Sequence, residues 1–188
     1  MSETEDKKLD ENSSYMGIPE APFVEDVDSY MNKEENLNNF QNVMRKLEEQ
    51  LNKYKFMEVH LQAKRKKLKS QIPDIKSSLE IVKEMKNRKD NAEEIETHYM
   101  LSDQVYMKAG IPPTDKVCLW LGANVMLEYC LDDADSLLSK NLSNAIKHLS
   151  QVEHDLDFLR NQCTTTEVTR ARVYNWDVKR RRAAKSST

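Results

Sequence analysis

Residues 117–129 read VCLWLGANVMLEY, and this stretch decides the fold. Apolar side chains recur at every second position in both of its halves, which is the period of a β-strand, and Gly122-Ala123-Asn124 between the halves is a turn signal. The apolar faces are formed by Val117, Leu119, Leu121, Val125, Leu127 and Tyr129. Cys118 and Trp120 make the other face of the first half apolar as well, so we expect that strand to be covered on both sides. The stretch therefore predicts a β-hairpin.

A second hairpin is predicted directly before the first. Strand-like runs at 97–101 and 104–109 are separated by Ser102-Asp103, and the later run places Val105, Met107 and Ala109 on one face. A segment rich in turn residues follows at 110–115. Residues 95–130 are therefore predicted to form two tandem β-hairpins.

Before this insert, the apolar period changes from two to seven. Every seventh residue is apolar in the series Phe40, Leu47, Tyr54, Leu61, Leu68, Ile75 and Val82. The accompanying seam position is apolar at both ends but charged in the middle, at Glu58 and Arg65, so the stripe has a weakened centre. Pro73 removes one helical hydrogen bond at a cost of about 3 kcal/mol, yet the stripe keeps its phase across it. We predict a coiled-coil helix over 37–94 with a kink at Pro73.

A second stripe follows the insert with alternating spacings of four and three residues. Its members are Leu138, Leu142, Ala145, Leu149, Val152, Leu156, Leu159 and Cys163. The spacing predicts a second coiled-coil helix over 131–178. The predicted fold is mainly α with a small β insert, a long antiparallel coiled-coil helical hairpin with two tandem β-hairpins at one end. Pairing of each helix with other chains is the alternative.

Composition and the two ends of the chain complete the domain organisation. Residues 1–36 hold eleven acidic residues against three lysines, so this segment is predicted to be largely disordered, although the apolar residues from Ile18 to Met31 favour a short helix or a docked segment. Residues 179–188 are predicted to be a basic, disordered tail. With three glycines in 188 residues, the chain has few tight turns and therefore long elements. We expect no membrane span and no signal peptide, and a cytoplasmic protein, with the nucleus left open.

Two isolated hairpins are marginally stable in water, and they leave apolar strand edges uncovered. Since both helices are committed to their own seam, we expect the hairpins to pair with strands of other subunits. The residues assigned to this subunit assembly are Val105, Met107, Val117, Leu119, Trp120, Leu121, Val125 and Leu127.

Several strings outside the repeating patterns carry a family resemblance. They are GIPEA at 17–21, FVEDVD at 23–28, YKFME at 54–58, PPTDKV at 112–117 and TTTEVTRARVYNWD at 164–177. Together with the order helix, two hairpins, helix, and with residues 117–129, they resemble the alpha-type subunits of prefoldin, the eukaryotic ones in particular. The resemblance covers about 17–182.

This resemblance implies a heterohexamer of two alpha-type and four beta-type subunits whose hairpins build a central β-barrel platform. It also implies coiled-coil arms that hold non-native proteins, such as actin and tubulin, for transfer to the cytosolic chaperonin. The implied partners are thus other prefoldin subunits, the chaperonin and its clients, with no membrane partner, and nucleic acid is not an expected one. No cofactor is implied, and the sequence has no phosphate-binding glycine-rich loop.

In an antiparallel helical hairpin, the start of the first helix and the end of the second lie together. The seam weakens there, with Thr166 and Arg170 at predicted core positions, while apolar residues persist nearby. The client-contact candidates are Val27, Tyr30, Met31, Val173, Tyr174 and Trp176. The alternative is that these residues close the end of the coiled coil or dock the N-terminal segment.

Other chemistries find little support in the sequence. The four histidines show neither an i, i+4 pair nor an HExxH motif, and no nucleophile lies in a recognisable arrangement with a base, so we expect neither a metal site nor an enzyme. The second functional hypothesis is a coiled-coil scaffold or adaptor that contacts nucleic acid through its basic tail. A scaffold needs only a dimer, whereas the prefoldin hypothesis requires assembly with other hairpin-bearing subunits.

Overall fold

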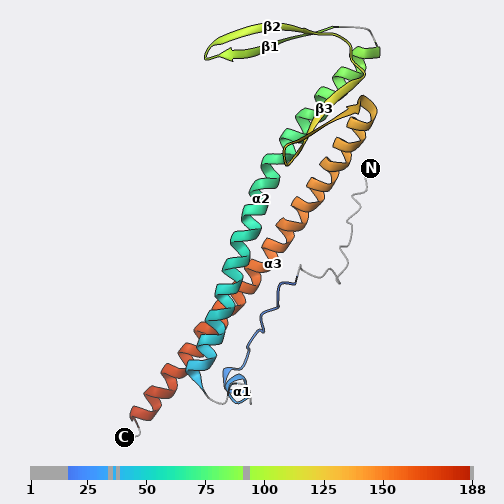
Figure 1. Cartoon of the computed structure of the whole chain (residues 1–188). Helices are drawn as coiled ribbons and strands as arrows, with labels where there is room; N and C mark the ends of the chain where they lie inside the picture. The colour runs from blue at the N-terminus through green and yellow to red at the C-terminus, as the bar shows by residue number, and fades with distance from the viewer. Residues whose placement is uncertain (1–16, 34–35, 37–38, 91–93, 187–188) are drawn as a thin grey trace, which may run out of the picture. The chain divides into compact units, whose positions relative to one another are not determined.

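Two long helices and two β-hairpins make up most of the chain (Figure 1). The computed structural model describes residues 17–33, 36, 39–90 and 94–186. The elements are α1 (Val27–Met31), α2 (Phe40–Asp90), β1 (Ile95–Ser102), β2 (Val105–Ile111), β3 (Lys116–Gly122), β4 (Val125–Cys130) and α3 (Leu131–Ser186). The predicted fold class, mainly helical with two small antiparallel hairpins, is confirmed. The chain divides into two units, residues 66–150 and residues 1–65 with 151–188.

The helix boundaries differ from the predicted ones at the C-terminal end. α2 runs without interruption through Pro73, as expected, whereas the kink stays a prediction. α3 continues to Ser186, so the prediction of a disordered tail from 179 onward is wrong for residues 179–186. The buried carboxylate of Asp177 accounts for the extension, because it pairs with Arg180 at 3.3 Å and Arg181 at 2.6 Å, one helical turn further on.

The two hairpins form two separate two-stranded antiparallel sheets, β1 with β2 and β3 with β4. Each observed strand lies within two residues of the predicted one at either end. In the turn between β3 and β4, Ala123 and Asn124 both have positive φ, of 48° and 61°, which is the pattern of a type I′ turn and suits the twist of a tight hairpin. The alternation of side chains and the Gly-Ala-Asn signal were therefore sufficient to locate this hairpin.

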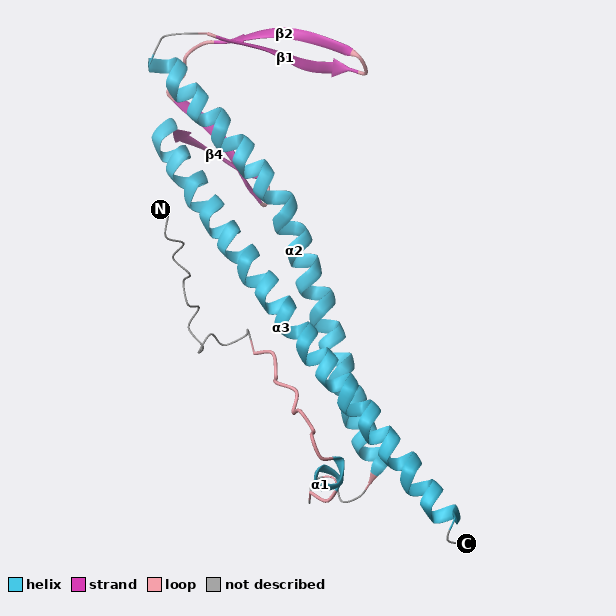
Figure 2. Cartoon of the chain, turned by 180° about the vertical axis from the view of Figure 1, so that it is seen from behind, coloured by secondary structure: helices cyan, strands magenta, loops and turns pink. Residues whose placement is uncertain are grey.

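In the 66–150 unit, the β3–β4 hairpin rests on the helices (Figure 2). Val82 of α2 and Leu131 and Ala134 of α3 form a buried cluster. The partly buried side chains packed against it are Met85, Val117, Leu119, Tyr129 and Leu138. Lys86 pairs with Asp132, and Lys89 pairs with Asp115 at 2.6 Å. One face of this hairpin is thus covered by the chain's own helices.

In the other unit, the first part of α2 and the last part of α3 lie side by side (Figures 1 and 2). The buried apolar residues of their seam are Val43, Leu47, Leu51, Tyr54, Val152, Leu156, Leu159 and Val173. Glu58, Leu61 and Arg65 are only half-buried, in keeping with the predicted weakened centre. The prediction of Arg170 as a core residue is wrong, because Arg170 is exposed and Thr169 is buried in its place. The buried seam runs from Thr166 to Thr169 and then to Val173, with spacings of three and four residues.

Candidate interaction surfaces

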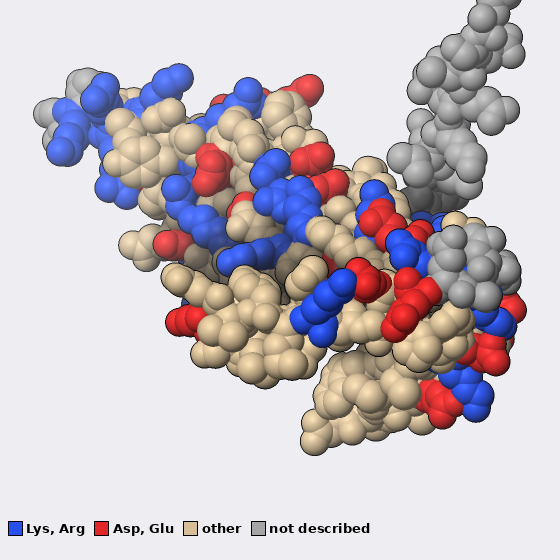
Figure 3. Space-filling view, turned by 90° about the horizontal axis from the view of Figure 1, so that it is seen from above, with Lys and Arg blue, Asp and Glu red and all other residues tan. Residues whose placement is uncertain are grey.

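The hairpins expose an unusual number of large apolar side chains for so few residues. Those exposed are Tyr99, Met100, Leu101, Val105, Tyr106, Met107, Ile111, Trp120, Leu121, Val125, Met126 and Leu127. Figure 3 shows wide areas of the visible face without acidic or basic side chains. Contiguous apolar surface of this kind usually marks a site of protein–protein contact.

The predicted assembly residues fall into two groups. Six of the eight are exposed by 44–60% of their surface: Val105, Met107, Trp120, Leu121, Val125 and Leu127. The other two, Val117 and Leu119, pack instead against the cluster formed by α2 and α3. The strand register places Trp120 opposite Met126, so both side chains lie on the same face of the hairpin, where they are exposed. The assembly role of these residues stays a prediction.

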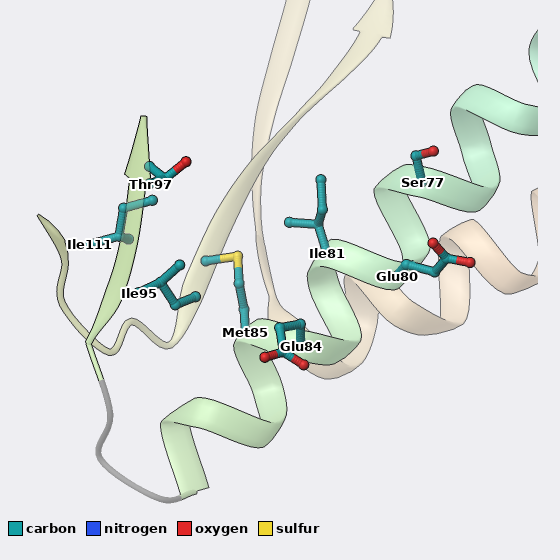
Figure 4. A pocket seen from close by; sticks show the side chains of 8 residues that line it. All are labelled: Ser77, Glu80, Ile81, Glu84, Met85, Ile95, Thr97 and Ile111. Carbon is teal, nitrogen blue, oxygen red and sulfur yellow. The ribbon is translucent and has the colours of Figure 1, made fainter. Parts of the chain in front are cut away.

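A cavity that the sequence analysis missed lies between α2 and the β1–β2 hairpin (Figure 4). It has a volume of about 640 Å³. Its lining residues are Ser77, Glu80, Ile81, Glu84, Met85, Ile95, Thr97 and Ile111. Ile81, which lines the cavity, is 60% exposed and lies outside the heptad stripe, as the neighbour of Val82. An apolar residue outside the stripe was therefore the sequence signal that could have indicated this apolar surface.

An N-terminal segment, which we call the strap (residues 17–33), lies along the helix pair in the 1–65/151–188 unit. The hydroxyl of Tyr54 donates to the carbonyl of Pro19 at 2.8 Å. The amide of Ala21 donates to Gln162 Oε1 at 2.7 Å, and Arg172 donates to the carbonyl of Val24 at 2.8 Å. The prediction of a largely disordered segment is therefore wrong for the strap, and the short helix or docked segment expected between Ile18 and Met31 is confirmed. Residues 1–16 lie outside the described residues.

The second part of the strap is the short helix α1. Asp26 caps its N-terminus by accepting from the backbone amides of Asp28 and Ser29. The hydrogen bond from the Ser29 hydroxyl, followed by those from the two amides, holds the pKa of Asp26 below its ordinary value. The indole of Trp176 on α3 donates to the carboxylate of Asp28. The helix is thus fixed at its first turn.

The strap and the helices share one apolar cluster, which we call the end cluster. Its buried members are Met31, Val43, Leu47 and Val173, and packed against them are Val27, Tyr30, Phe40, Met44 and Trp176. The structure therefore brings together five of the six client-contact candidates, and Tyr174 is the exception, being 56% exposed. Met31 and Val173 are completely buried, which is the arrangement expected if these residues close the helix pair and dock the N-terminal segment. Their contact with clients stays a prediction.

Burial shapes the chemistry of the interior beside the strap. Desolvation raises the pKa of the Tyr54 hydroxyl, against the effect of the hydrogen bond it accepts from Gln50. Desolvation also raises the pKa of the Cys163 thiol, and the nearby carboxylates of Glu58 and Glu167 add to this effect. At neutral pH Tyr54 is therefore a hydrogen-bond donor.

Within the ranges that the structure describes, no group of three or more His, Cys, Asp or Glu side chains is arranged to hold a metal ion. Over the same ranges, no helix combines the length and the apolar character that crossing a membrane requires. The surfaces with the clearest physical character are thus the exposed hairpins and the surface of α2 and α3 that contacts the strap, which we call the groove.

The helix–hairpins–helix order and these surfaces can now be compared with known proteins. A family model described as prefoldin subunit matches residues 54–176. The chain belongs to the prefoldin family. It is 60% identical over 167 residues to prefoldin subunit 3 of Mus musculus and of Homo sapiens, which covers 89% of this chain and 85% and 84% of theirs. Prefoldin subunit 3 of Drosophila melanogaster is 53% identical over 189 residues, covering all of this chain and 95% of its own.

A solved structure, of filamentous PFD from Methanocaldococcus jannaschii, aligns over 61% of this chain and 92% of its own with 17% identity and a TM-score of 0.46. The family assignment rests on the sequence matches instead. Prefoldin subunits are co-chaperones rather than enzymes, and membership in the family implies assembly with other prefoldin subunits. The predicted resemblance is therefore confirmed.

Proposed function

We propose that this chain is a subunit of a heterohexameric co-chaperone that holds non-native proteins without ATP and passes them to the cytosolic chaperonin. In this proposal the chain acts in the cytoplasm beside alpha-type and beta-type subunits, with unfolded actin and tubulin among the clients. The observation that carries it is the set of apolar side chains left uncovered on both hairpins, such as Trp120 and Met126. A chain that functions alone would cover them.

The energy available from these side chains is a substantial part of what stable assembly requires. Fully burying an apolar side chain of this size contributes about 1.5–3 kcal/mol, and six of the predicted assembly residues are exposed. Because these six side chains are 44–60% exposed, about half of that gain remains for each, a total on the order of 5–9 kcal/mol from this chain. Association costs about 4–15 kcal/mol, so the apolar surface of the partner must contribute as well.

Assembly is tested by mixing the purified chain with candidate beta-type subunits and a second alpha-type subunit, and measuring the mass by light scattering. We expect a hexamer for the wild type and its loss in a double variant, Trp120→Ser with Leu127→Ser. The matched control is Phe56→Ser with Val59→Ser, two apolar residues of α2 that are 67% and 68% exposed. A hexamer that survives the hairpin variant, or a wild type that remains a homodimer, would refute the assembly proposal and favour a scaffold.

Client capture is a separate test on the assembled complex. We expect the complex to suppress the aggregation of denatured actin in the absence of ATP, and to release it to added chaperonin. A complex that assembles but leaves aggregation unchanged would refute the capture step alone.

A further inference from the structure

The strap is held in part through its backbone. Three helix side chains, Tyr54, Gln162 and Arg172, bond to main-chain groups of Pro19, Ala21 and Val24. Such contacts do not depend on the side chains of the bound segment, in the same way that main-chain hydrogen bonds provide affinity in other peptide-binding grooves. The groove therefore offers hydrogen bonds to any extended chain.

Specificity at the groove comes from a few apolar anchors. Val24 is 5% exposed and Met31 is completely buried, and Val27 packs beside Met31 on the end cluster. If the strap left, Val43, Leu47 and Val173 would lose the cover that Met31 provides. The surface beneath the strap is thus apolar.

The strap is acidic, and one arginine of the helices, Arg172, contacts it. The strap carries four carboxylates, on Glu20, Glu25, Asp26 and Asp28, against one lysine. Arg172 lies over the ring of Phe23 at 5.3 Å and donates to the carbonyl of Val24, whereas Arg180 lies over Trp176 of its own helix at 4.9 Å and pairs with Asp177. A segment of the strap's own apolar and acidic composition therefore suits the position of Arg172 better than a basic one.

We propose that the strap is a displaceable intramolecular ligand: it covers an apolar capture groove on the helix pair, and an extended client segment of apolar and acidic residues takes its place. Without a client, the strap occupies the groove; during capture, a client segment of the same chemistry occupies it. This proposal rests on the proposed function, because it assigns client capture to a particular surface of the chain.

The short connection between the strap and α2 determines the effective concentration of the strap at the groove. Only residues 34–39 separate the two. A short tether gives an effective concentration in the millimolar range, so a free peptide of equal intrinsic affinity competes only near ~1 mM. A single weak segment is therefore excluded, whereas a client held by several arms of one complex competes successfully.

The test uses the assembled complex and a fluorescein-labelled peptide of the sequence of residues 17–33. The strap is loosened by Val24→Ser with Met31→Ser, which removes its two buried anchors and leaves the groove unaltered. The matched control is Glu25→Ser, because Glu25 is an exposed residue of the same segment. We expect the peptide to bind the loosened complex at least about tenfold more tightly than the wild type or the control, by fluorescence anisotropy.

Client capture is measured on the same complexes. We expect the loosened complex to suppress aggregation of denatured actin at a lower concentration than the wild type, and excess unlabelled peptide to reverse the gain. Circular dichroism and light scattering establish that the variant is helical and assembled. If it is not, a locked variant takes its place, with Ala21→Cys and Gln162→Cys joined by a short bismaleimide in a background whose three native cysteines are replaced by serine. The complex with this variant should capture less client after cross-linking than before it.

Each result decides the matter. Peptide binding without any change in capture by the loosened or the locked complex would overturn the proposal while leaving the proposed function intact. Failure of the peptide to bind the loosened complex would overturn it too, since the strap would then be a fixed part of the fold. If no complex captures client at all, the proposed function fails, and the strap loses its role as a competitor for clients.

Discussion

Tyr54 connects the strap to the centre of the helix pair, so the loss of its hydroxyl tests how firmly the strap is held. The ring is completely buried in the seam. Its hydroxyl accepts from Gln50 at 2.8 Å and donates to the carbonyl of Pro19 at 2.8 Å. Tyr54→Phe keeps the ring and removes both hydrogen bonds.

The expected cost follows from the exposure of the two partners. Pro19 is exposed and Gln50 is half-buried, so water replaces the lost hydroxyl at both groups and no buried polar group is left unsatisfied. Each hydrogen bond then contributes its net value of about 0.5–1.5 kcal/mol. The bond to Pro19 acts on docking of the strap, and the bond from Gln50 acts within α2. We therefore expect docking to weaken by about 1 kcal/mol and the whole fold to lose about 1–2 kcal/mol.

The assay is amide hydrogen exchange, resolved by residue. The amide of Ala21, bonded to Gln162, should exchange about fivefold faster in the variant, because local opening of the strap exposes it. The amide of Leu156 in the middle of α3 should change less, because it is exposed only by larger opening. Tyr174→Phe is the control, since Tyr174 is 56% exposed on the same helix pair. An unchanged rate at Ala21, or equal acceleration at Ala21 and Leu156, would refute this account of the strap.

Three further predictions concern ionisable side chains. Because the pKa of Asp26 is lowered, its cap on α1 is fully present above the unfolded value of 3.8 and is lost as pH falls through the folded pKa. Opening of the strap, measured by amide hydrogen exchange and corrected for the intrinsic rate, should therefore increase in acid, and Asp26→Ala should remove that pH dependence. Asp155→Leu should raise Tm by several degrees in thermal unfolding, because this completely buried carboxylate has one oxygen, Oδ2, without a hydrogen-bond partner; a lower Tm would contradict this. Cys163 should react with iodoacetamide at pH 7 more slowly than the exposed Cys118 and Cys130 of the isolated chain, since burial raises its pKa, and equal rates in the folded state would count against it.

Local patterns were sufficient for most of the fold. The β-strand alternation in 117–129 located β3 and β4, and the seven-residue stripe located α2, because both signals arise from neighbouring residues. The exposed apolar side chains of the hairpins could be predicted in part: Trp120 is exposed, whereas Val117 and Leu119 pack against the chain's own helices.

The apolar residues from Ile18 to Met31 favoured a docked segment, but the place where the strap docks could not be predicted from such patterns. Its hydrogen bonds join residues 141 and 148 positions apart, as in the pairs of Ala21 with Gln162 and Val24 with Arg172, and no local period encodes them. The same holds for the seam at Thr169, because a Thr and an Arg are both polar and the apolar pattern does not distinguish them, whereas in the structure Thr169 is buried and Arg170 is exposed. The end of α3 depended on the pairing of Asp177 with two arginines, whereas the run of basic residues alone indicated disorder.

The two apolar surfaces of this chain differ in what covers them. Nothing in the described part of the chain covers the outward face of β3–β4, where the exposed Trp120 and Met126 lie, and this is the face that we propose another subunit covers. The end cluster is covered by the strap, yet the seam beside it is weaker than an all-apolar one, because Thr169, one turn before Val173, buries a hydroxyl without a hydrogen-bond partner. Such a group lowers the stability of the helix pair locally and places it within reach of a competing ligand. A permanent contact at the hairpins and a conditional one at the strap are therefore what the distribution of these side chains favours.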